Sequence, residues 1–398
     1  MKPIKVLFVA ANYPNEYYMW GPWNKEANVS VAASESIMAE TIAPLPYSLP
    51  FIFFPYYRLS KIPLVEYGFE GKIHRPRFFY LLPKKLFYRY AGFFYHRSIK
   101  NYCKNLPKPD LVHCHHVYPD GYAFIKQCQK WDIPLIVDIH STTLFKNYAY
   151  QKDISNQIHE TLDYAEKIIC ISQEIHDCAI FRGIKRKKLE VIPLGVDTEK
   201  FKSRNKLLCK KKIGIEANFI LLFVGHLEKM KGVYDLILAI SQMPKQLQKK
   251  IKVIIIGIGS EKKQLSNLVK KFGLDENFLF LGEVKRDILP YYFSIADIFI
   301  LPSLSEGRPM VIYEAMASEC AIISTDVGSI SEQIINNHNG LLIKPHDIDG
   351  LADKIEFLFT DNKFRNILGK NGRKRIFQEQ WTWDNYSHKL IEIYKDLR

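Results

Sequence analysis

Short apolar runs alternate with amphipathic segments along the first half of the chain. The amphipathic pattern of Asn24–Glu35 predicts a helix. The apolar runs predict strands at Lys5–Ala10, Glu40–Ala43, Leu111–His115, Pro134–Ile139, Lys167–Ile171 and Leu189–Ile192. Because nearly continuous apolar runs are typical of parallel strands that helices cover on both faces, we expect an α/β domain with a parallel sheet.

The same alternation restarts in the second half of the chain. Helical patterns at Tyr234–Gln242 and Glu261–Phe272 separate the predicted strands. These strands are Phe219–Gly225, Lys252–Ile256, Phe278–Leu281, Ile298–Leu301 and Ala321–Thr325. We therefore expect an α/β fold of two doubly wound, Rossmann-like domains that face each other across a cleft.

The length of 398 residues also favours two domains, because a single hydrophobic core stops growing well below this size. The polar, basic stretch Asp197–Lys212 is the predicted linker. We assign residues 1–200 to the first domain and residues 201–375 to the second. Residues 376–398 are expected to form a helical segment that crosses back to the first domain.

The composition excludes several classes of protein. An apolar fraction of 47% with 25% charged residues is that of a globular protein without disorder or repeats. The first apolar run is short and continues into Asn12-Tyr13-Pro14, which predicts a buried strand and not a signal peptide. The seven cysteines are scattered singly, as is typical of reduced thiols in a cytosolic protein. We expect a cytoplasmic protein.

The net charge of +14 has one conspicuous concentration, the acid-free and aromatic stretch Gly71–Pro109. Docking on an anionic membrane and a solvated basic face over core aromatics both remain open for this stretch. Its basic residues are Lys72, Arg75, Arg77, Lys84, Lys85, Arg89, Arg97, Lys100, Lys104 and Lys108.

The segment after the predicted strand Ile298–Leu301 is the most informative one in the chain. It lies at the carboxyl end of a strand, where open α/β sheets bind ligands. Pro309 suits a first helical turn, so Glu306 is expected in the preceding loop. The backbone amides of Met310 and Val311 would then point from a helix N-terminus toward an anion.

Glu314 is predicted to lie inside this helix on a largely apolar face, since Met310, Val311 and Ala317 are its neighbours one turn away. A buried carboxylate needs partners. Ribose hydroxyl groups and a structural salt bridge are both open as the partner.

A second candidate lies in the segment Phe223–Val233. Its strand ends at Gly225, and Lys231-Gly232 opens the following helix. A lysine at a helix N-terminus that faces a cleft suits a phosphate, whereas the alternative is one solvated lysine among many. Gly257 and Gly259 do not complete a dinucleotide fingerprint, because Lys262 occupies the third glycine position, and they predict only a tight turn near a nucleotide base.

The first half contributes a group of histidines at strand ends. His113, His115 and His116 follow one strand and His140 ends the next. Adjacent strand residues point to opposite faces and no carboxylate completes a site, so we expect no metal. His140 is the candidate for contact with a substrate, against the alternative of a core histidine with satisfied hydrogen bonds.

Taken together, these segments resemble the retaining glycosyltransferases of family 4, whose fold is the two-domain GT-B architecture. The most specific element is the Glu-x7-Glu pair of Glu306 and Glu314 within PSLSEGRPMVIYEAMA. Four further segments follow the family's order: VIPLGVDTEKF (Val191–Phe201), FVGHLEKMKGV (Phe223–Val233), FLGEV (Phe280–Val284) and TDVGSISE (Thr325–Glu332). The stretches DLVHCHHVYPDGYA (Asp110–Ala123) and GKIHRPRFFYLLPK (Gly71–Lys84) resemble a branch associated with surface-polysaccharide assembly.

The resemblance implies roles for particular residues. Glu306 would lie against the donor sugar and Glu314 would hold the ribose, with Lys231 at the departing diphosphate. His140 would contact the transferred sugar from the first, acceptor-side domain. The implied catalytic residues are Glu306, Lys231 and His140; the implied donor-binding residues are Gly21, Gly225, His226, Lys231, Gly257, Gly259, Val284, Glu306, Gly307, Arg308, Met310, Val311 and Glu314; and the acceptor-side candidates are His113, His115 and Asp120.

The resemblance further implies a nucleotide-sugar donor, a glycan or lipid-linked acceptor, no cofactor, no metal and no nucleic acid. Some positions depart from the family pattern. His226 replaces an arginine beside the diphosphate, which removes a permanent charge, and Leu194 replaces an asparagine. Glu319 and Ala321 replace a glycine and a proline; if the first of these positions requires a left-handed conformation, Glu319 would cost about 1 kcal/mol.

Two other classes of function stay open on the sequence alone. One is another GT-B enzyme, such as a nucleotide-sugar epimerase, which would release an altered sugar without an acceptor. The other is a membrane or nucleic-acid binding module built on the basic stretch, which would bind independently of nucleotide-sugar.

Overall fold

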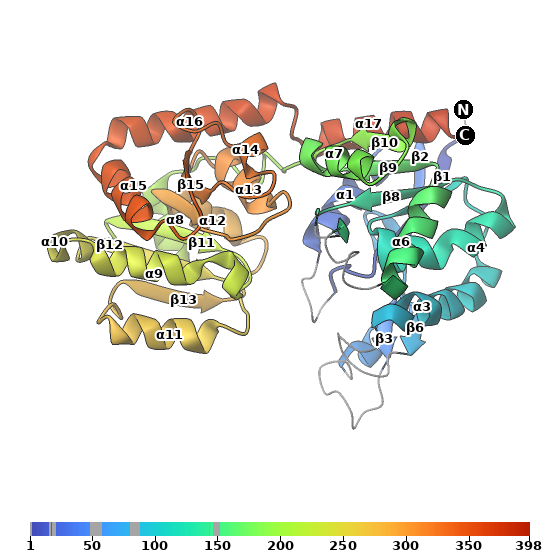
Figure 1. Cartoon of the computed structure of the whole chain (residues 1–398), viewed down its shortest axis with the longest axis horizontal. Helices are drawn as coiled ribbons and strands as arrows, with labels where there is room; N and C mark the ends of the chain where they lie inside the picture. Colours follow the sequence, from blue (N-terminus) through green and yellow to red (C-terminus); the bar gives the residue numbers. More distant parts are fainter. Residues whose placement is uncertain are drawn as a thin grey trace. The chain divides into compact units, whose positions relative to one another are not determined.

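The computed structural model describes residues 2–15, 17, 21–47, 58–79, 88–142, 144–145 and 152–398 (Figure 1). Internal contacts divide the chain into two compact units. The N-terminal unit consists of Met1–Leu194 together with Trp383–Arg398, and the C-terminal unit consists of Gly195–Thr382.

The N-terminal unit is built on a sheet whose described strands run in the order β10-β9-β8-β7-β1-β2-β5-β4. All neighbours in it are parallel except β4 and β5, and β3 forms a separate parallel pair with β6. The strands are β1 (Ile4–Val9), β2 (Ile37–Ile42), β3 (Leu45–Tyr47), β4 (Val65–Gly68), β5 (Gly71–His74), β6 (Arg77–Phe79), β7 (Leu111–Cys114), β8 (Leu135–Ile139), β9 (Lys167–Cys170) and β10 (Leu189–Val191).

Helices from both ends of the chain pack in this unit. The last helix, α17 (Trp383–Asp396), packs against the first, α1 (Pro22–Ala32), so the chain's final segment belongs to the N-terminal unit (Figure 1). The other described α-helices are α3 (Tyr88–Tyr102), α4 (Tyr122–Trp131), α6 (Lys152–Tyr164) and α7 (Gln173–Phe181).

The C-terminal unit has an all-parallel sheet in the order β13-β12-β11-β14-β15-β16, the doubly wound arrangement that was predicted. Its strands are β11 (Phe219–Val224), β12 (Ile251–Ile256), β13 (Phe278–Gly282), β14 (Ile298–Leu301), β15 (Ala321–Thr325) and β16 (Leu341–Ile343). Its helices are α8 (Lys206–Ile213), α9 (Val233–Gln242), α10 (Lys245–Gln248), α11 (Lys262–Lys271), α12 (Leu289–Ile295), α13 (Met310–Ala317), α14 (Ile330–Gln333), α15 (Ile348–Thr360) and α16 (Asn362–Gln378).

The prediction that Asp197–Lys212 is a linker is wrong. Its second half forms α8, where the Asn205 side chain caps the helix by accepting from the Leu208 amide, and Gly214 ends it in a left-handed conformation. The residue just before the stretch, Val196, donates its amide to the Trp381 carbonyl at 3.1 Å. This hydrogen bond joins the first residues of the C-terminal unit to its last ones. The units therefore meet at Leu194 and Gly195 and again at Thr382 and Trp383, and not at the predicted boundaries after residues 200 and 375.

Candidate active site

The C-terminal unit brings two predicted residues together where its strand order reverses. The loops that follow the adjacent strands β11 and β14 carry Lys231 and Glu306, and the Leu304 amide joins these loops by donating to the Met230 carbonyl at 2.7 Å. Lys231 Nζ lies 2.7 Å from Glu306 Oε1. Such a reversal at the carboxyl ends of parallel strands is where doubly wound sheets bind ligands.

A glycine explains how the Lys231 loop fits against its neighbour. Gly232 has φ of 66°, and a β-carbon placed there would lie 1.8 Å from the Pro302 carbonyl oxygen. A larger residue would therefore push the loop away from the strand end that precedes Glu306. The close approach of the two loops, and with it the ion pair, depends on glycine at this position.

The site concentrates fixed positive charge beside a partly exposed carboxylate. The side chains of Glu306 and Lys231 are 8% and 24% exposed, and the Ser303 hydroxyl also donates to Glu306 Oε1, at 2.7 Å. The helix that follows, α13, begins at Met310. Pro309, which was predicted to lie in its first turn, is instead the N-cap, one position earlier. The first amides of this helix and the lysine together suit an anionic group.

Glu314 is buried, as predicted, with only 1% of its side chain exposed. Its partner among the described residues is Arg286, whose Nη2 lies 2.5 Å from Glu314 Oε1. Arg286 comes from the loop after β13, two residues beyond Val284, which is half-buried against the core. The salt bridge left open by the sequence is thus present, and it joins the carboxylate predicted to hold the ribose to the loop of Val284, a predicted donor-binding residue.

The side chain of Arg308, a predicted donor-binding residue, is engaged in contacts inside the C-terminal unit. Its guanidinium is buried, donates to the Tyr313 hydroxyl and pairs with Glu332. It also stacks over the Trp381 ring, at 5.1 Å from the centroid. These contacts join α13, α14 and the segment that follows α16, so the side chain of Arg308 has a structural role.

The glycines of the neighbouring loops serve mainly to let backbones approach one another. A β-carbon on Gly257 would lie 1.9 Å from the Gly225 carbonyl oxygen, and one on Gly259 would lie 2.2 Å from the Leu227 carbonyl oxygen. His226 lies between these contacts with an exposed side chain. The loops after β11 and β12 are therefore packed together, and their role in holding a nucleotide stays a prediction.

In the N-terminal unit, His113 and His115 lie two residues apart, so both side chains point to one face and flank Asp138 of β8. His113 Nε2 lies 2.7 Å from Asp138 Oδ1, and His115 Nδ1 lies 3.0 Å from Oδ2. The second ring nitrogens contact Tyr394 of α17 at 2.6 Å and Asn28 of α1 at 2.7 Å. Although burial opposes ionisation, these histidines hold the pKa of Asp138 well below its usual range.

The predicted acceptor-side residues have partners inside the N-terminal unit. His113 and His115 are buried with both ring nitrogens engaged, so their side chains do not line a surface. Asp120 is also fully buried and accepts hydrogen bonds from the Ala11 amide and from His116. All three side chains therefore have partners inside the N-terminal unit, and their contact with an acceptor stays a prediction.

His140 lies at the margin of this network, with 17% of its side chain exposed and Nε2 3.9 Å from Asp138 Oδ2. Burial and then the neighbouring His116 lower its pKa to about 3, so the ring is neutral at ordinary pH. Among the described residues, His115, Asp138 and His140 bring potential ligand atoms within 4.8 Å of one another. Because hydrogen bonds already occupy His115 and Asp138, the grouping is explained without an ion, and the expectation of no metal stays a prediction.

Comparison with known families and proteins identifies the chain. Residues 206–375 match the model of the glycosyl transferases group 1, and residues 56–200 match that of glycosyltransferase family 4. An uncharacterised glycosyltransferase of Methanocaldococcus jannaschii is 30% identical over 302 residues, which cover 72% of this chain and 75% of that protein. The chain belongs to the family 4 glycosyltransferases.

Other similar proteins extend this result. A Bacillus subtilis glycosyltransferase proposed to act in teichuronic acid biosynthesis is 28% identical over 62% of this chain and 60% of its own. The structure of sucrose-phosphate synthase from Thermosynechococcus elongatus matches with a TM-score of 0.82 at 20% identity over 99% of both chains. That of Anabaena HepE in complex with UDP matches with a TM-score of 0.75 at 17% identity over 100% of both. These likenesses confirm the GT-B fold.

Two residues of this glycosyltransferase's candidate site were missed by the sequence reasoning, Ser303 and Arg286. Ser303 precedes Glu306 by three residues, a spacing that could have suggested its hydrogen bond. Arg286 had no distinguishing signal among the many basic residues. Gly21, in contrast, has φ of 60° and is the N-cap of α1, while residues 16 and 18–20 of the loop before it lie outside the described residues.

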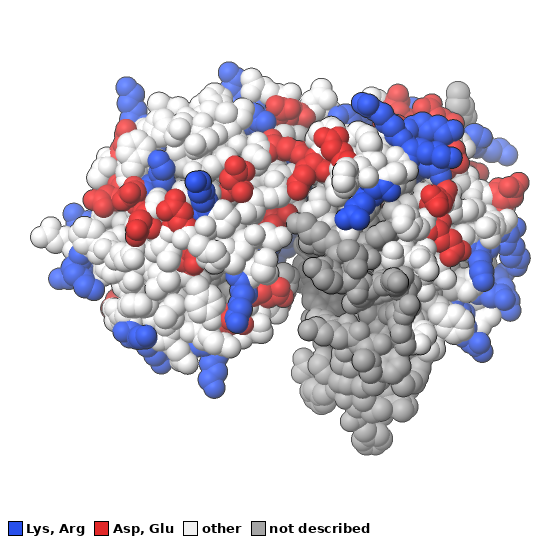
Figure 2. All heavy atoms as spheres, in the orientation of Figure 1, with Lys and Arg blue, Asp and Glu red and all other residues white. Residues whose placement is uncertain are grey.

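The family assignment leaves the relation to membranes open. Within the described residues, none of the helices combines the length and apolarity that crossing a membrane requires. The face of the C-terminal unit displayed in Figure 2 carries basic and acidic side chains interspersed. The positive net charge therefore does not form one continuous basic surface on that face.

Proposed function

We propose that this glycosyltransferase moves a hexosyl group from a nucleotide-sugar to a glycan or lipid-linked acceptor during assembly of a cell-surface polysaccharide, on the cytoplasmic side of the membrane. The ion pair of Lys231 and Glu306 at the reversal of the strand order carries the proposal. The relative proposed to act in teichuronic acid biosynthesis supports the pathway. The match to HepE in complex with UDP-glucose, at 17% identity, agrees with such a donor through the fold.

In the proposed reaction, the bond between the anomeric carbon and the diphosphate oxygen breaks, and the diphosphate leaves with the electron pair. An acceptor hydroxyl forms the new bond at that carbon, and its proton passes to the leaving diphosphate oxygen. Lys231 and the first amides of α13 stabilise the charge on the leaving diphosphate, while Glu306 fixes the ammonium and lies against the transferred sugar. We propose retention of the anomeric configuration and no metal, since these groups supply the positive charge.

A donor screen tests this proposal. UDP-, GDP- and ADP-sugars are titrated against the protein, and the donor that binds is incubated with glycan and lipid-linked acceptors while nucleotide release is followed. NMR of the product should show the donor's anomeric configuration, and EDTA should leave the rate unchanged. Release of an altered sugar without an acceptor would favour the epimerase alternative, and an inverted product would contradict retention.

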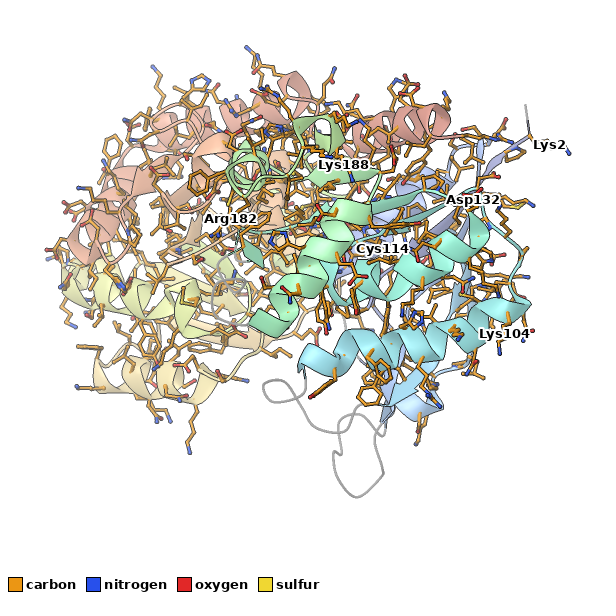
Figure 3. The ribbon with its side chains drawn as sticks, turned by 45° about the vertical axis from the view of Figure 1, so that its right-hand side comes forward. Lys2, Lys104, Cys114, Asp132, Arg182 and Lys188 are labelled. Carbon is orange, nitrogen blue, oxygen red and sulfur yellow. The ribbon has the colours of Figure 1, made fainter. Side chains whose placement is uncertain are left out.

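We further propose that α3 brings the enzyme to an anionic membrane, where a lipid-linked acceptor resides. Tyr90 and Phe93 are 41% and 56% exposed, and Arg97, Lys100 and Lys104 are exposed at helical spacing along the same face. Lys104 lies just beyond the end of α3 (Figure 3). A helix face with aromatic residues at one end and basic residues along it suits the interface of an anionic bilayer.

Two other basic residues of the predicted stretch do not contribute to this face. Arg75 is buried, pairs with Glu66 at 2.8 Å and donates to the Pro14 carbonyl. Arg77 donates to the Ile62 carbonyl. Residues 80–87, with Lys84 and Lys85, and the side chain of Arg89 lie outside the described residues.

Liposome sedimentation tests the membrane contact. Vesicles with anionic lipid should bind the protein and release it as salt rises, and replacing Arg97, Lys100 and Lys104 by Glu should abolish binding. A matched control replaces three exposed lysines of α11 in the other unit and should leave binding unchanged; these are Lys262, Lys263 and Lys270. Equal binding to neutral vesicles, or equal loss in the control variant, would contradict the proposal.

A further inference from the structure

The ion pair between Arg286 and Glu314 joins two parts of the candidate donor site. Glu314 lies in the second turn of α13, and Arg286 lies in the loop between β13 and α12. Their contact is 2.5 Å long, with side-chain exposures of 1% for Glu314 and 19% for Arg286. A carboxylate this well buried requires a cation or several hydrogen-bond donors to remain ionised, and Arg286 supplies the cation.

Other contacts fix the position of the guanidinium. Arg286 stacks over the ring of Phe201, 5.1 Å from its centroid, and Phe201 is itself buried. Beside this contact, Lys200, which precedes Phe201, places its Nζ 2.9 Å from Oδ1 of Asp287, which follows Arg286. The loop after β13 is therefore attached to the segment that opens the C-terminal unit as well as to α13. Because stacking restricts the planar guanidinium, it presents its N–H groups to Glu314 in one orientation.

We propose that Arg286 is a positioning residue for the donor nucleoside: it holds the Glu314 carboxylate so that its acceptor sites meet the ribose hydroxyls, and so makes donor binding selective for ribose over deoxyribose. This inference rests on the proposed function, in which Glu314 holds the ribose. A carboxylate has about four acceptor sites, so one oxygen bonded to a guanidinium leaves acceptor capacity for hydroxyl donors.

The charge of Arg286 serves donor binding in a second way. A buried carboxylate near the anionic diphosphate would repel it, and the repulsion would be strong where water is excluded. The guanidinium neutralises this charge locally, so the site keeps an acceptor for the ribose without a net negative charge beside the phosphates. Arg286 does not touch the reacting atoms in this arrangement, so its loss should weaken binding more than it slows turnover.

Arg286→Met is the principal test, because methionine keeps an unbranched apolar stem over Phe201 and removes the charge and the donors. UDP, GDP and ADP are titrated calorimetrically, and the tightest ligand is compared with its 2′-deoxy and 3′-deoxy forms. The variant should bind the ribonucleotide about ten- to a hundredfold more weakly, the usual effect of losing a hydrogen bond to a charged group. Its preference for the ribonucleotide over the deoxy forms should fall, while kcat at saturating donor should change less than about threefold.

Two further variants separate positioning from general stability. Arg286→Lys keeps the charge but loses the planar fork, so it should recover part of the affinity and less of the ribose preference. Lys200→Met removes the 2.9 Å pair with the exposed Asp287 of the same loop and should leave both quantities unchanged, as exposed ion pairs contribute little. Should Arg286→Met not fold, Arg286→Lys carries the test through the ribose preference alone.

The outcomes distinguish the two levels of the argument. If the unmodified protein binds none of the nucleoside diphosphates, the proposed function fails. If it binds one of them and Arg286→Met and Arg286→Lys keep the full ribose preference, the positioning role is overturned and the proposed function stands. Equal weakening of ribonucleotide and deoxynucleotide binding in both variants would assign Arg286 to the loop's structure and also overturn the inference.

Discussion

Removal of the Lys231 ammonium is the perturbation with the most sharply defined consequence. Lys231 Nζ and the Ser303 hydroxyl both lie 2.7 Å from the same oxygen of Glu306. In Lys231→Ala the carboxylate keeps the serine as a donor but loses its cation, and the leaving diphosphate loses its fixed positive charge. In Glu306→Gln the lysine stays but is no longer held by an ionic contact.

The size of the effect follows from this geometry. Loss of one preorganised electrostatic contact to developing charge slows turnover by at least about a hundredfold, or roughly 2.7 kcal/mol of transition-state stabilisation. The cost to folding should be smaller, about 1–2 kcal/mol, because Ser303 still bonds to Glu306 and the lysine side chain is 24% exposed. Turnover and stability should therefore separate clearly.

Nucleotide release at saturating donor and acceptor measures the turnover, and thermal unfolding of the same samples measures stability. Lys229→Ala is the matched control, since Lys229 is an exposed lysine in the same 3-10 turn and should be dispensable. The double variant Lys231→Ala with Glu306→Gln should be little slower than either single variant, because the two residues share one contact.

The reasoning would be refuted by near-normal turnover in both single variants with the fold intact. Strict additivity of the two losses would also count against it, because independent effects would mean that the ion pair does not act as a unit. A loss in Lys229→Ala equal to that in Lys231→Ala would reassign the effect to the general charge of the loop.

Three further outcomes are expected. Gly232→Ala should lower turnover and stability, because its β-carbon would lie 1.8 Å from the Pro302 carbonyl oxygen. The control Gly214→Ala has a similar φ of 67° and open space around it, so it should cost only the backbone strain of about 1 kcal/mol. Equal losses in unfolding temperature for the two variants would contradict this. His226→Arg should lower the KM for the donor, because a guanidinium brings a permanent cation to the loop that is predicted to meet the diphosphate; an unchanged KM would defeat this prediction. Burial lowers the pKa of His140 to about 3, so between about pH 6.5 and 3 the unfolded chain binds one proton more than the folded protein at this residue. The free energy of unfolding should therefore decrease as the pH falls through this range, by up to about 1.4 kcal/mol per pH unit. His140→Gln should reduce that slope in denaturant titrations, and an unchanged slope would show that His140 is not the group responsible.

The strands could be predicted closely because burial on both faces leaves a plain apolar run. The predicted strands Ile298–Leu301 and Ala321–Thr325 match β14 and β15 residue for residue. The linker prediction failed because lysine content was given more weight than capping signals, although Asn205 and Gly214 bracket a helix. Glu319 does adopt the left-handed conformation that was considered for it as a condition, with φ of 59°.

The candidate site was predictable where topology alone determines position. Lys231 and Glu306 both follow strands, and neighbouring parallel strands end at one edge of the sheet, so the sequence could place them together. The roles of His113 and Arg286 could not be predicted in this way. His113 contacts Tyr394, 281 residues away, and Arg286 contacts Glu314 with α12 and β14 between them in the sequence. No local spacing encodes such pairings.

Binding of a nucleotide-sugar at Lys231 is the central claim, and a thermal titration measures it most directly. UDP-, GDP- and ADP-sugars are added in turn to the whole protein and to Lys231→Ala while unfolding is followed. One of these donors should stabilise the unmodified protein by about 2.7 kcal/mol at a hundred times its Kd, and the same concentration should stabilise Lys231→Ala far less. Absence of stabilisation by any of them, or equal stabilisation of both proteins, would contradict the claim.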